Sequence, residues 1–314
     1  NQFMERKKGV ENFNESEPHF LIEYMNRHLD WAVIVCLVGG GQEINTGEAG
    51  IEAWFDALNA DFKDWGVYVS RDIFQEEYFG THIEAYKNSR YHYVPELHLA
   101  TSIRSFRSER VSDFVQYLLN GNKAASLKLI SEIGNKYPIL VTRDLAKAKK
   151  WVTNKTGEHG VKRCGLMASS NAIRLQPEGI FTKLKLGSDV TKWFLNDRND
   201  IRSSYSLEQP ATEFEIQGLE IDYGILAWDL NLRIDPDTGQ FVYKKFRGDK
   251  WQNVNQDMAR RYIKNVYRVL LTRAREGLII FVPHGDPTGK DQTRPTNEYD
   301  DIAKYLSECG IKEI

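Results

Sequence analysis

The sequence predicts an α/β protein with parallel sheets flanked by helices, and three observations support this class. Apolar residues 139–142, a helical pattern over 144–153 and apolar residues 163–169 follow one another. Alternating strands and helices of this kind require crossover connections between parallel strands. An almost unbroken apolar run over residues 31–38 is typical of a buried strand, and so is the run over residues 278–282.

The first 96 residues are expected to form one domain. Ser16 can cap a helix over residues 18–28, and the buried strand at 31–38 follows. That strand ends in Gly39-Gly40-Gly41-Gln42, a place where glycines permit close backbone approach and a glutamine can hydrogen-bond a phosphate or an attacking water. The alternative is a tight turn that needs positive φ. A helix over 51–59 and a strand over 66–70 complete this part.

A domain boundary is predicted near residues 95–100, which gives domains 1–96 and 97–314. A strand-like alternation begins at Leu97 and runs into a helix expected to start near Ser108. Arg104 and Arg107 are candidate functional cations in this segment. A solvated loop is the alternative interpretation.

The second domain continues with a helix over 124–133 and the strand–helix–strand pattern described above. Residues 193–195 are a third apolar stretch, and the segment 211–220 leads into a strand over 223–228. Glu220, just before that strand, could contact a ribose or a backbone amide, or could be a capping carboxylate. Residues 231–254 read as a hairpin excursion with a turn at 235–239.

Arg273 and Arg275 lie where a helix gives way to a strand. Apolar residues at three-and-four spacing precede them, and the apolar run 278–282 follows. Two arginines held at the end of a rigid element can clamp phosphate oxygens through their guanidinium forks. The alternative is a solvated basic end that favours the helix C-terminal dipole.

Composition narrows the function classes. The formal net charge of −2 argues against a protein that is basic overall, so any nucleic-acid surface must be local. Three widely separated cysteines favour a reducing, cytoplasmic compartment over a disulfide framework. No apolar run approaches the roughly 18 residues that span a bilayer, so we expect no membrane association.

Three patterns are set aside. Residues 285–290 lack the spacer, the following Ser/Thr and the preceding strand of a phosphate loop. His92 and His98 have no nearby thiols or paired carboxylates, so no metal site is predicted. A nuclease would need clustered acids at metal-binding geometry, and Glu220, Asp222 and Asp229 are explained as caps and edge charges.

Four separated segments resemble, in order, motifs of superfamily 1 helicases. Residues 37–44 resemble motif III and Ser102-Ile103-Arg104-Ser105 resembles motif IV. Gln217-Gly218-Leu219-Glu220 resembles motif V, with Gln217 in place of lysine, and Leu271-Thr272-Arg273-Ala274 resembles motif VI. Nearly the whole chain is similar to the Schlafen group 3 type DNA/RNA helicase domain, which is a RecA-like P-loop NTPase.

The resemblance implies roles for single positions. Gln42, with Gly40 and Gly41 beside it, would sense the γ-phosphate of ATP from the first RecA-like lobe, and Arg104 and Arg273 would reach it from the second. Arg273 would be the arginine finger. Gln217, Gly218 and Glu220 would face the nucleotide, and Arg275 would support the site. Nucleotide-driven closure of the lobes would move single-stranded DNA or RNA.

The sequence departs from the family because neither a phosphate loop nor a pair of magnesium carboxylates is recognisable in it. We therefore expect residues 1–96 to be the distal part of the first lobe and residues 97–314 to be the second. ATP and Mg²⁺ are expected in an intact parent ATPase, with no tight binding by this fragment alone. The alternative is a catalytically inactive helicase-fold module for nucleic-acid or protein recognition. The oligomeric state is not predicted.

Overall fold

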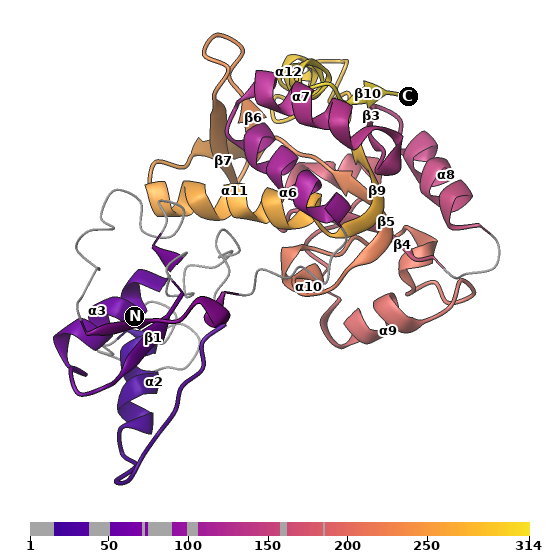
Figure 1. The fold of residues 1–314 in the computed structure, drawn as a ribbon. Helices are drawn as coiled ribbons and strands as arrows, with labels where there is room; N and C mark the ends of the chain where they lie inside the picture. The colour runs from indigo at the N-terminus through magenta and orange to yellow at the C-terminus, as the bar shows by residue number, and fades with distance from the viewer. Residues whose placement is uncertain are drawn as a thin grey trace. The chain divides into compact units, whose positions relative to one another are not determined.

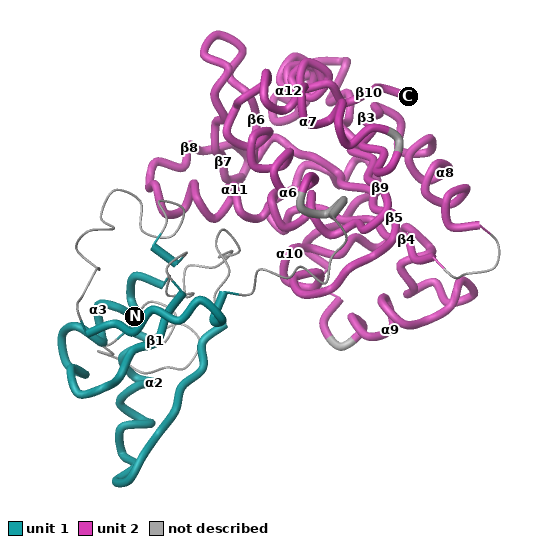
Figure 2. Tube along the Cα trace, viewed as in Figure 1, with its two compact units in different colours: residues 1–103 teal, residues 104–314 magenta. Residues whose placement is uncertain are grey.

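The computed structural model describes residues 16–37, 51–70, 73–74, 90–98, 106–157, 162–184 and 186–314. The chain divides into two compact units, residues 1–103 and residues 104–314 (Figure 2). The sequence placed the boundary between residues 96 and 97. The two units are described separately below.

The described residues of unit 1 form two helices and a small parallel sheet. Helix α2 (Glu17–Met25) begins at Ser16, whose hydroxyl accepts the N–H of His19 at 3.2 Å, as predicted. Helix α3 (Ile51–Ala60) packs Ile51 and Phe55 against the parallel strands β1 (Val67–Val69) and β2 (Tyr91–Tyr93). A 3-10 turn, η3 (Pro95–Leu97), follows β2.

One prediction in unit 1 is wrong. Residues 31–37 form no strand, and no described residue pairs with their backbone. Trp31, Val33, Val35 and Leu37 are 78%, 65%, 79% and 84% exposed. A buried strand needs a neighbour to satisfy its backbone groups and a layer to cover its side chains. The described part of unit 1 supplies no paired strand, and Ile34 alone packs against its core, on the cluster of Ile22, Ala57 and Phe62.

Unit 2 is built on a five-stranded parallel sheet flanked by helices (Figure 1). Its strand order is β10-β3-β9-β5-β4, and every neighbouring pair is parallel. The strands are β3 (Ile139–Thr142), β4 (Cys164–Ala168), β5 (Ile221–Ala227), β9 (Ala274–Phe281) and β10 (Lys312–Glu313). The predicted α/β class with parallel sheets is confirmed, and the arrangement is consistent with a RecA-like fold.

Helices cover this sheet. Helix α8 (Leu145–Thr156) begins at Asp144, which accepts the N–H groups of Ala146 and Lys147, and packs Ala148 and Val152 onto β4, β5 and β9. Helices α6 (Phe106–Leu119), α7 (Lys123–Ile133), α11 (Asp257–Leu271) and α12 (Thr296–Glu308) lie together away from α8 (Figure 1). The buried Tyr305 hydroxyl joins two of them by donating to Leu118 O at 2.5 Å.

A separate antiparallel sheet interrupts the parallel pattern. It consists of β6 (Leu232–Ile234), β7 (Phe241–Arg247) and β8 (Lys250–Asn253). The predicted turn at 235–239 joins β6 to β7, and Gly239 has φ +67° there. The predicted hairpin excursion is confirmed.

The remaining short elements are 3-10 turns and single helical turns. They are η4 (Gly134–Lys136), η5 (Ile173–Glu178), η6 (Gly187–Asp189), α9 (Val190–Leu195), η7 (Ser204–Ser206) and α10 (Glu213–Ile216). Residues 193–195, the third apolar stretch, form the end of α9. The Trp193 ring packs over Gly165 of β4, where a Cβ atom would lie 2.7 Å from it.

Candidate functional site

The structure brings the predicted motif V and motif VI segments to one edge of the parallel sheet. Ile221, the first residue of β5, pairs with Ala274, the first residue of β9, and its N–H donates to Arg273 O at 3.1 Å. Glu220 and Arg273 therefore immediately precede two adjacent parallel strands. Both lie at the amino-terminal edge of the sheet.

Arg273 is buried, with 3% of its surface exposed. Its Nε donates to Val269 O at 3.1 Å, in the last turn of α11, and Nη2 lies 3.4 Å from the Thr272 hydroxyl. The guanidinium shares Val269 O with the N–H and the hydroxyl of Thr272, and its charge favours the helix dipole. The interpretation of Arg273 as a solvated basic end is wrong, since the side chain is folded against its own helix.

Arg275 differs from Arg273 because its side chain is 56% exposed. Its Nη2 lies 2.7 Å from Asp222 Oδ1, and the other oxygen of Asp222 accepts the N–H of Arg163 at 2.6 Å. Asp222, which is 6% exposed, thus joins the start of β4 to the start of β9. Its role is to connect the strands at this edge, and Arg275 is held beside them.

A tight turn delivers Glu220 to the same edge. Leu219 N–H donates to Ile216 O at 3.0 Å, Gln217 has φ −60° and ψ 124°, and Gly218 has φ +84°. These angles define a type II turn, whose third position strongly favours glycine. The backbone of Gly218 is exposed, with open space where a side chain would be.

Glu220 is half-buried and acts electrostatically on Tyr137. Burial, and after it the negative charge of Glu220, raise the pKa of Tyr137 far above its usual value. The Tyr137 hydroxyl donates to Ala274 O at 3.0 Å, at the start of β9. The geometry therefore groups Gln217, Gly218, Glu220, Arg273 and Arg275 at one edge.

The other predicted site residues fall outside the described residues. These are Gly40, Gly41, Gln42 and Arg104. Their predicted roles stay predictions.

The carboxyl-terminal edge of the sheet holds a charged residue, Asp229, whose burial the sequence did not reveal. Asp229, which follows β5, is completely buried. Its Oδ1 accepts from the Tyr299 hydroxyl at 2.7 Å and from Leu230 N–H at 2.8 Å, and Oδ2 accepts from Arg174 N–H at 2.9 Å. The interpretation of Asp229 as an edge charge is wrong. Burial raises its pKa, partly offset by these hydrogen bonds.

Further buried polar groups complete this edge. Tyr267 donates to Asn231 Oδ1 at 2.7 Å, and Asn231 Nδ2 donates to the Ser169 hydroxyl at 3.3 Å. Arg143, after β3, donates to Val282 O and Pro283 O, each at 2.8 Å, just beyond β9. The polar groups at the carboxyl-terminal edge thus hydrogen-bond loops and hold them to the sheet. The sequence signal for it was a charged residue placed directly after an apolar strand, in Trp228-Asp229.

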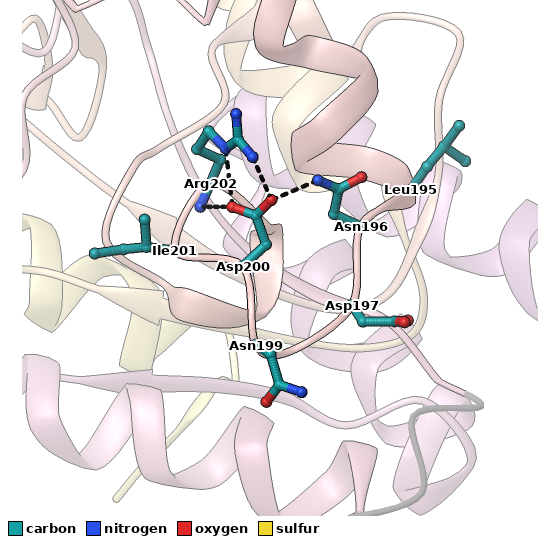
Figure 3. A pocket seen from close by; sticks show the side chains of 7 residues that line it. All are labelled: Leu195, Asn196, Asp197, Asn199, Asp200, Ile201 and Arg202. Carbon is teal, nitrogen blue, oxygen red and sulfur yellow. Dashed lines mark hydrogen bonds and ion pairs between the residues drawn. The ribbon is translucent and has the colours of Figure 1, made fainter.

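A hollow of about 820 Å³ lies elsewhere in unit 2, within the loop after α9. Figure 3 shows the Asp200 carboxylate at its wall, bound by Arg202 at 2.7 and 2.9 Å and by Asn196 at 2.6 Å. The hydrogen bonds from Arg202 lower the pKa of Asp200. The hollow is open to solvent and none of the predicted site residues line it, so it is not the site considered below.

Two further findings concern metals and membranes. Within the described residues, no three His, Cys, Asp or Glu side chains lie close enough together to hold a metal ion. None of the described helices combines the length and the apolar character needed to cross a membrane.

Comparison with known proteins identifies a family. The family model described as "Schlafen group 3, DNA/RNA helicase domain" matches residues 3–284, which is most of the chain. No curated protein matches the sequence.

Proposed function

Because the chain belongs to the Schlafen group 3 DNA/RNA helicase domain family, we propose that it works as part of a superfamily 1-like, nucleic-acid-stimulated ATPase. Membership makes it a helicase-like domain of a nucleic-acid-related family. ATP hydrolysis, single-stranded DNA or RNA as partner, and the roles of single residues are the parts that we propose.

The observation that carries the proposal is the grouping at the amino-terminal edge of the sheet. Glu220 and Arg273 precede adjacent strands that pair at Ile221 and Ala274. Glu220 and Arg273, in the segments that resemble motifs V and VI, are 53 residues apart in sequence. The two segments nevertheless meet at this edge of the sheet. A phosphate-binding site needs such convergence, because a polyphosphate must be contacted from several sides at once.

In this proposal each residue has a distinct task. Arg273 neutralises charge on the transferring phosphoryl group once it turns from Val269 O toward the nucleotide. Arg275, tethered to Asp222 at 2.7 Å, adds positive charge beside it. Gly218 offers an exposed backbone that a ligand can approach closely. Gln42, with Gly40 and Gly41, and Arg104 would contribute the remaining γ-phosphate contacts.

ATP fits this donor set in chemical terms, since two guanidinium groups and an open glycine backbone are typical polyphosphate contacts. When bound with Mg²⁺, ATP supplies the transferable phosphoryl group. Glu220 and Gln217 would orient the ribose side, by accepting or donating hydrogen bonds at their carboxylate and amide. We propose none of the described residues as a Mg²⁺ ligand.

The cysteines favour a cytoplasmic location. Cys164 and Cys309 are buried free thiols and Cys36 is an exposed one. Burial raises the pKa of Cys309 to about 11, so this thiol stays protonated and unreactive at neutral pH. Three unpaired cysteines are what a reducing compartment allows.

The test is magnesium-dependent ATP hydrolysis by the full-length protein, with and without single-stranded DNA or RNA. We expect stimulation by nucleic acid and a loss of about a thousandfold in kcat for Arg273→Ala, the size that arginine fingers supply. Arg143→Ala is the matched control, because it also removes a guanidinium bound to backbone carbonyls. It should lower stability and leave kcat per folded molecule unchanged. Equal losses in both variants would contradict the assignment.

Two observations favour a second function. Arg273 is bound to its own helix, and Gln217 stands where the motif has lysine. A helicase-fold module that recognises nucleic acid or protein without hydrolysing ATP would tolerate both features. Binding of single-stranded DNA or RNA by a full-length protein that shows no nucleotide turnover would establish this alternative.

A further inference from the structure

The hairpin formed by β7 and β8 has two unlike faces. The strands are paired in register, with Phe246 opposite Trp251 on one face and Arg247 opposite Lys250 on the other. A two-residue turn, Gly248-Asp249, joins them, and Gly248 has φ +63°. Figure 1 shows β7 beside α11, and Figure 2 marks β8 next to it.

The inner face is anchored to the body of unit 2. The rings of Phe246 and Trp251 meet edge to face at 5.2 Å, and the Trp251 indole N–H donates to Thr293 O at 2.8 Å. Arg174 and Arg233 stack on these rings, at 5.4 Å from Phe246 and 5.3 Å from Trp251. A two-stranded hairpin needs such packing for stability, so this face supplies it.

The outer face carries Lys245, Arg247, Lys250 and Gln252, all exposed. Within the described part of the chain, none of these three cations has a carboxylate within 4.0 Å, whereas Lys123, Lys149 and Lys162 in the same unit are ion-paired. Residues 244–250 contain four cations and one carboxylate, in a chain whose formal net charge is −2. Three of these four cations lie on the outer face, and Lys244, opposite Asn253, lies on the inner one.

The pairing of Arg247 with Lys250 is unfavourable for the hairpin itself. Like charges directly opposite each other across two strands destabilise a sheet. A polyanion laid along the face would remove this repulsion, because each cation would then face a phosphate. The arrangement therefore favours a ligand with regularly spaced negative charges.

We propose that the outer face of the β7–β8 hairpin, formed by Lys245, Arg247, Lys250 and Gln252, binds the phosphodiester backbone of single-stranded DNA or RNA. This inference rests on the proposed function, because it names the surface that would hold the nucleic acid. The three cations contact phosphates, and the Gln252 amide contacts a sugar or base edge. Binding through the backbone makes the contact independent of sequence.

The experiment measures equilibrium binding of fluorescent oligo(dT) and oligo(U), without ATP, by the 314-residue chain. The oligonucleotides are about 20 nucleotides long, beyond the roughly 4–16 nucleotides that one binding fold covers. The variant combines Lys245→Gln, Arg247→Gln and Lys250→Gln. The control combines Lys147→Gln, Lys150→Gln and Lys155→Gln, which remove the same charge from exposed positions of α8.

Loss of three phosphate contacts should reduce the slope of log K against log salt by about 2, since each single-strand contact contributes about 0.7. The hairpin variant should then bind roughly 100-fold more weakly at about 0.1 M salt, with DNA and RNA affected alike. The control should bind as the wild type does. The melting temperature of the hairpin variant should not fall, because the inner face is unchanged and the repulsion between Arg247 and Lys250 is removed.

Several results would overturn the inference. Equal weakening in the hairpin variant and the α8 control would show that only net charge matters. A variant that aggregates while its folded fraction binds normally would show that the cations only protect an edge strand. Poly-glutamate bound as tightly as the oligonucleotides and lost in the same variant would point to an acidic protein partner. Absence of ATP hydrolysis would leave this binding result intact, so the two proposals fail separately.

Discussion

The two edges of the five-stranded sheet use charged residues in opposite ways. At the carboxyl-terminal edge, Asp229 is fully buried and Arg143 binds the two carbonyls that follow β9. At the amino-terminal edge, Glu220 is half-buried and the Arg275 side chain is 56% exposed. The carboxyl-terminal edge is closed by its own hydrogen bonds. The amino-terminal edge buries Arg273 and Asp222 but also keeps charge near solvent.

This difference indicates which edge can bind a ligand. Open α/β sheets commonly bind ligands beyond the carboxyl ends of their strands. In unit 2 the groups at that end already serve as partners for loops and for α12, through Tyr299. The arginines and the glutamate that resemble helicase motifs lie at the opposite end. We therefore place the proposed nucleotide contacts of unit 2 at the amino-terminal edge.

Of the substitutions that test this difference between the two edges, Asp229→Ala should have the largest effect on stability. The change leaves the Tyr299 hydroxyl and the N–H groups of Leu230 and Arg174 without their acceptor in a buried place. Unsatisfied buried donors should lower the free energy of unfolding by about 3 kcal/mol, as measured by urea denaturation. ATP hydrolysis per folded molecule should be unchanged, and a selective loss of kcat would mean that the carboxyl-terminal edge is also functional.

Gly218→Ala should have the next largest effect. The alanine must adopt φ near +84° in the type II turn, which should cost about 1–2 kcal/mol for a residue with a side chain. Gly289→Ala, at φ +68° in the loop after β9 and likewise with open space around a Cβ atom, is the matched control. Both should lower the melting temperature similarly, but only Gly218→Ala should impair ATP hydrolysis, because it disturbs the approach to Glu220. Unimpaired hydrolysis would remove this turn from the site.

A pH titration sharpens the comparison further. Burial raises the pKa of Glu213 above the usual 4.5, more than its hydrogen bonds with Ser170 lower it. At a pH between the pKa of Glu213 in the unfolded state and its pKa in the folded state, only the folded state binds the proton. Protonation of Glu213 therefore stabilises the fold fully below pH 4.5, and this stabilisation is lost as the pH rises through the folded-state pKa.

Glu213→Gln should remove this part of the pH dependence of the unfolding free energy. The glutamine amide can still accept the Ser170 N–H, now bound at 2.8 Å, and donate to its hydroxyl, now at 2.6 Å. The measurement is the difference in unfolding free energy between wild type and variant from about pH 4 to pH 7, the range in which a raised carboxyl pKa acts. A difference that does not vary with pH would show that Glu213 titrates normally.

The smallest effect on stability is expected from Arg275→Gln. Only the Arg275 side of this ion pair is exposed, but the buried Asp222 keeps the hydrogen bond from Arg163 N–H, so loss of the contact should cost about 1 kcal/mol and shift the melting temperature little. Lys149→Gln, which breaks the exposed pair with Glu208, is the control. A reduced kcat in Arg275→Gln alone would support its auxiliary role at the site, and identical kcat values would remove it.

Much of unit 2 could be predicted because its elements are encoded locally. The helix-to-strand change at α11 and β9 follows from a shift in apolar period, and Asp144 signals the start of α8. The sequence did not assign residues 193–195 to a strand or a helix, because three apolar residues fit either type. The contact of Trp193 with Gly165 is not encoded in that stretch. The apolar run at 31–37 was misjudged because a strand also requires a neighbour that the run does not encode.

The candidate site shows the same limit. The sequence located Arg273 and Glu220 at the ends of elements, since motif order and element boundaries are visible in it. It could not show that Arg273 folds onto Val269 O, or that Asp229 is buried. The burial of Asp229 depends on Arg174 and Tyr299, which are 55 and 70 residues away along the chain.

Photo-cross-linking tests the central claim most directly. The full-length protein would be labelled with ATP carrying a photoreactive group on its γ-phosphate, digested, and analysed by mass spectrometry. The account predicts that, within unit 2, labelled peptides contain residues 217–220 or 273–275, and that unlabelled ATP competes. Label confined to residues 169–174 or 229–233, at the carboxyl-terminal edge, would contradict it.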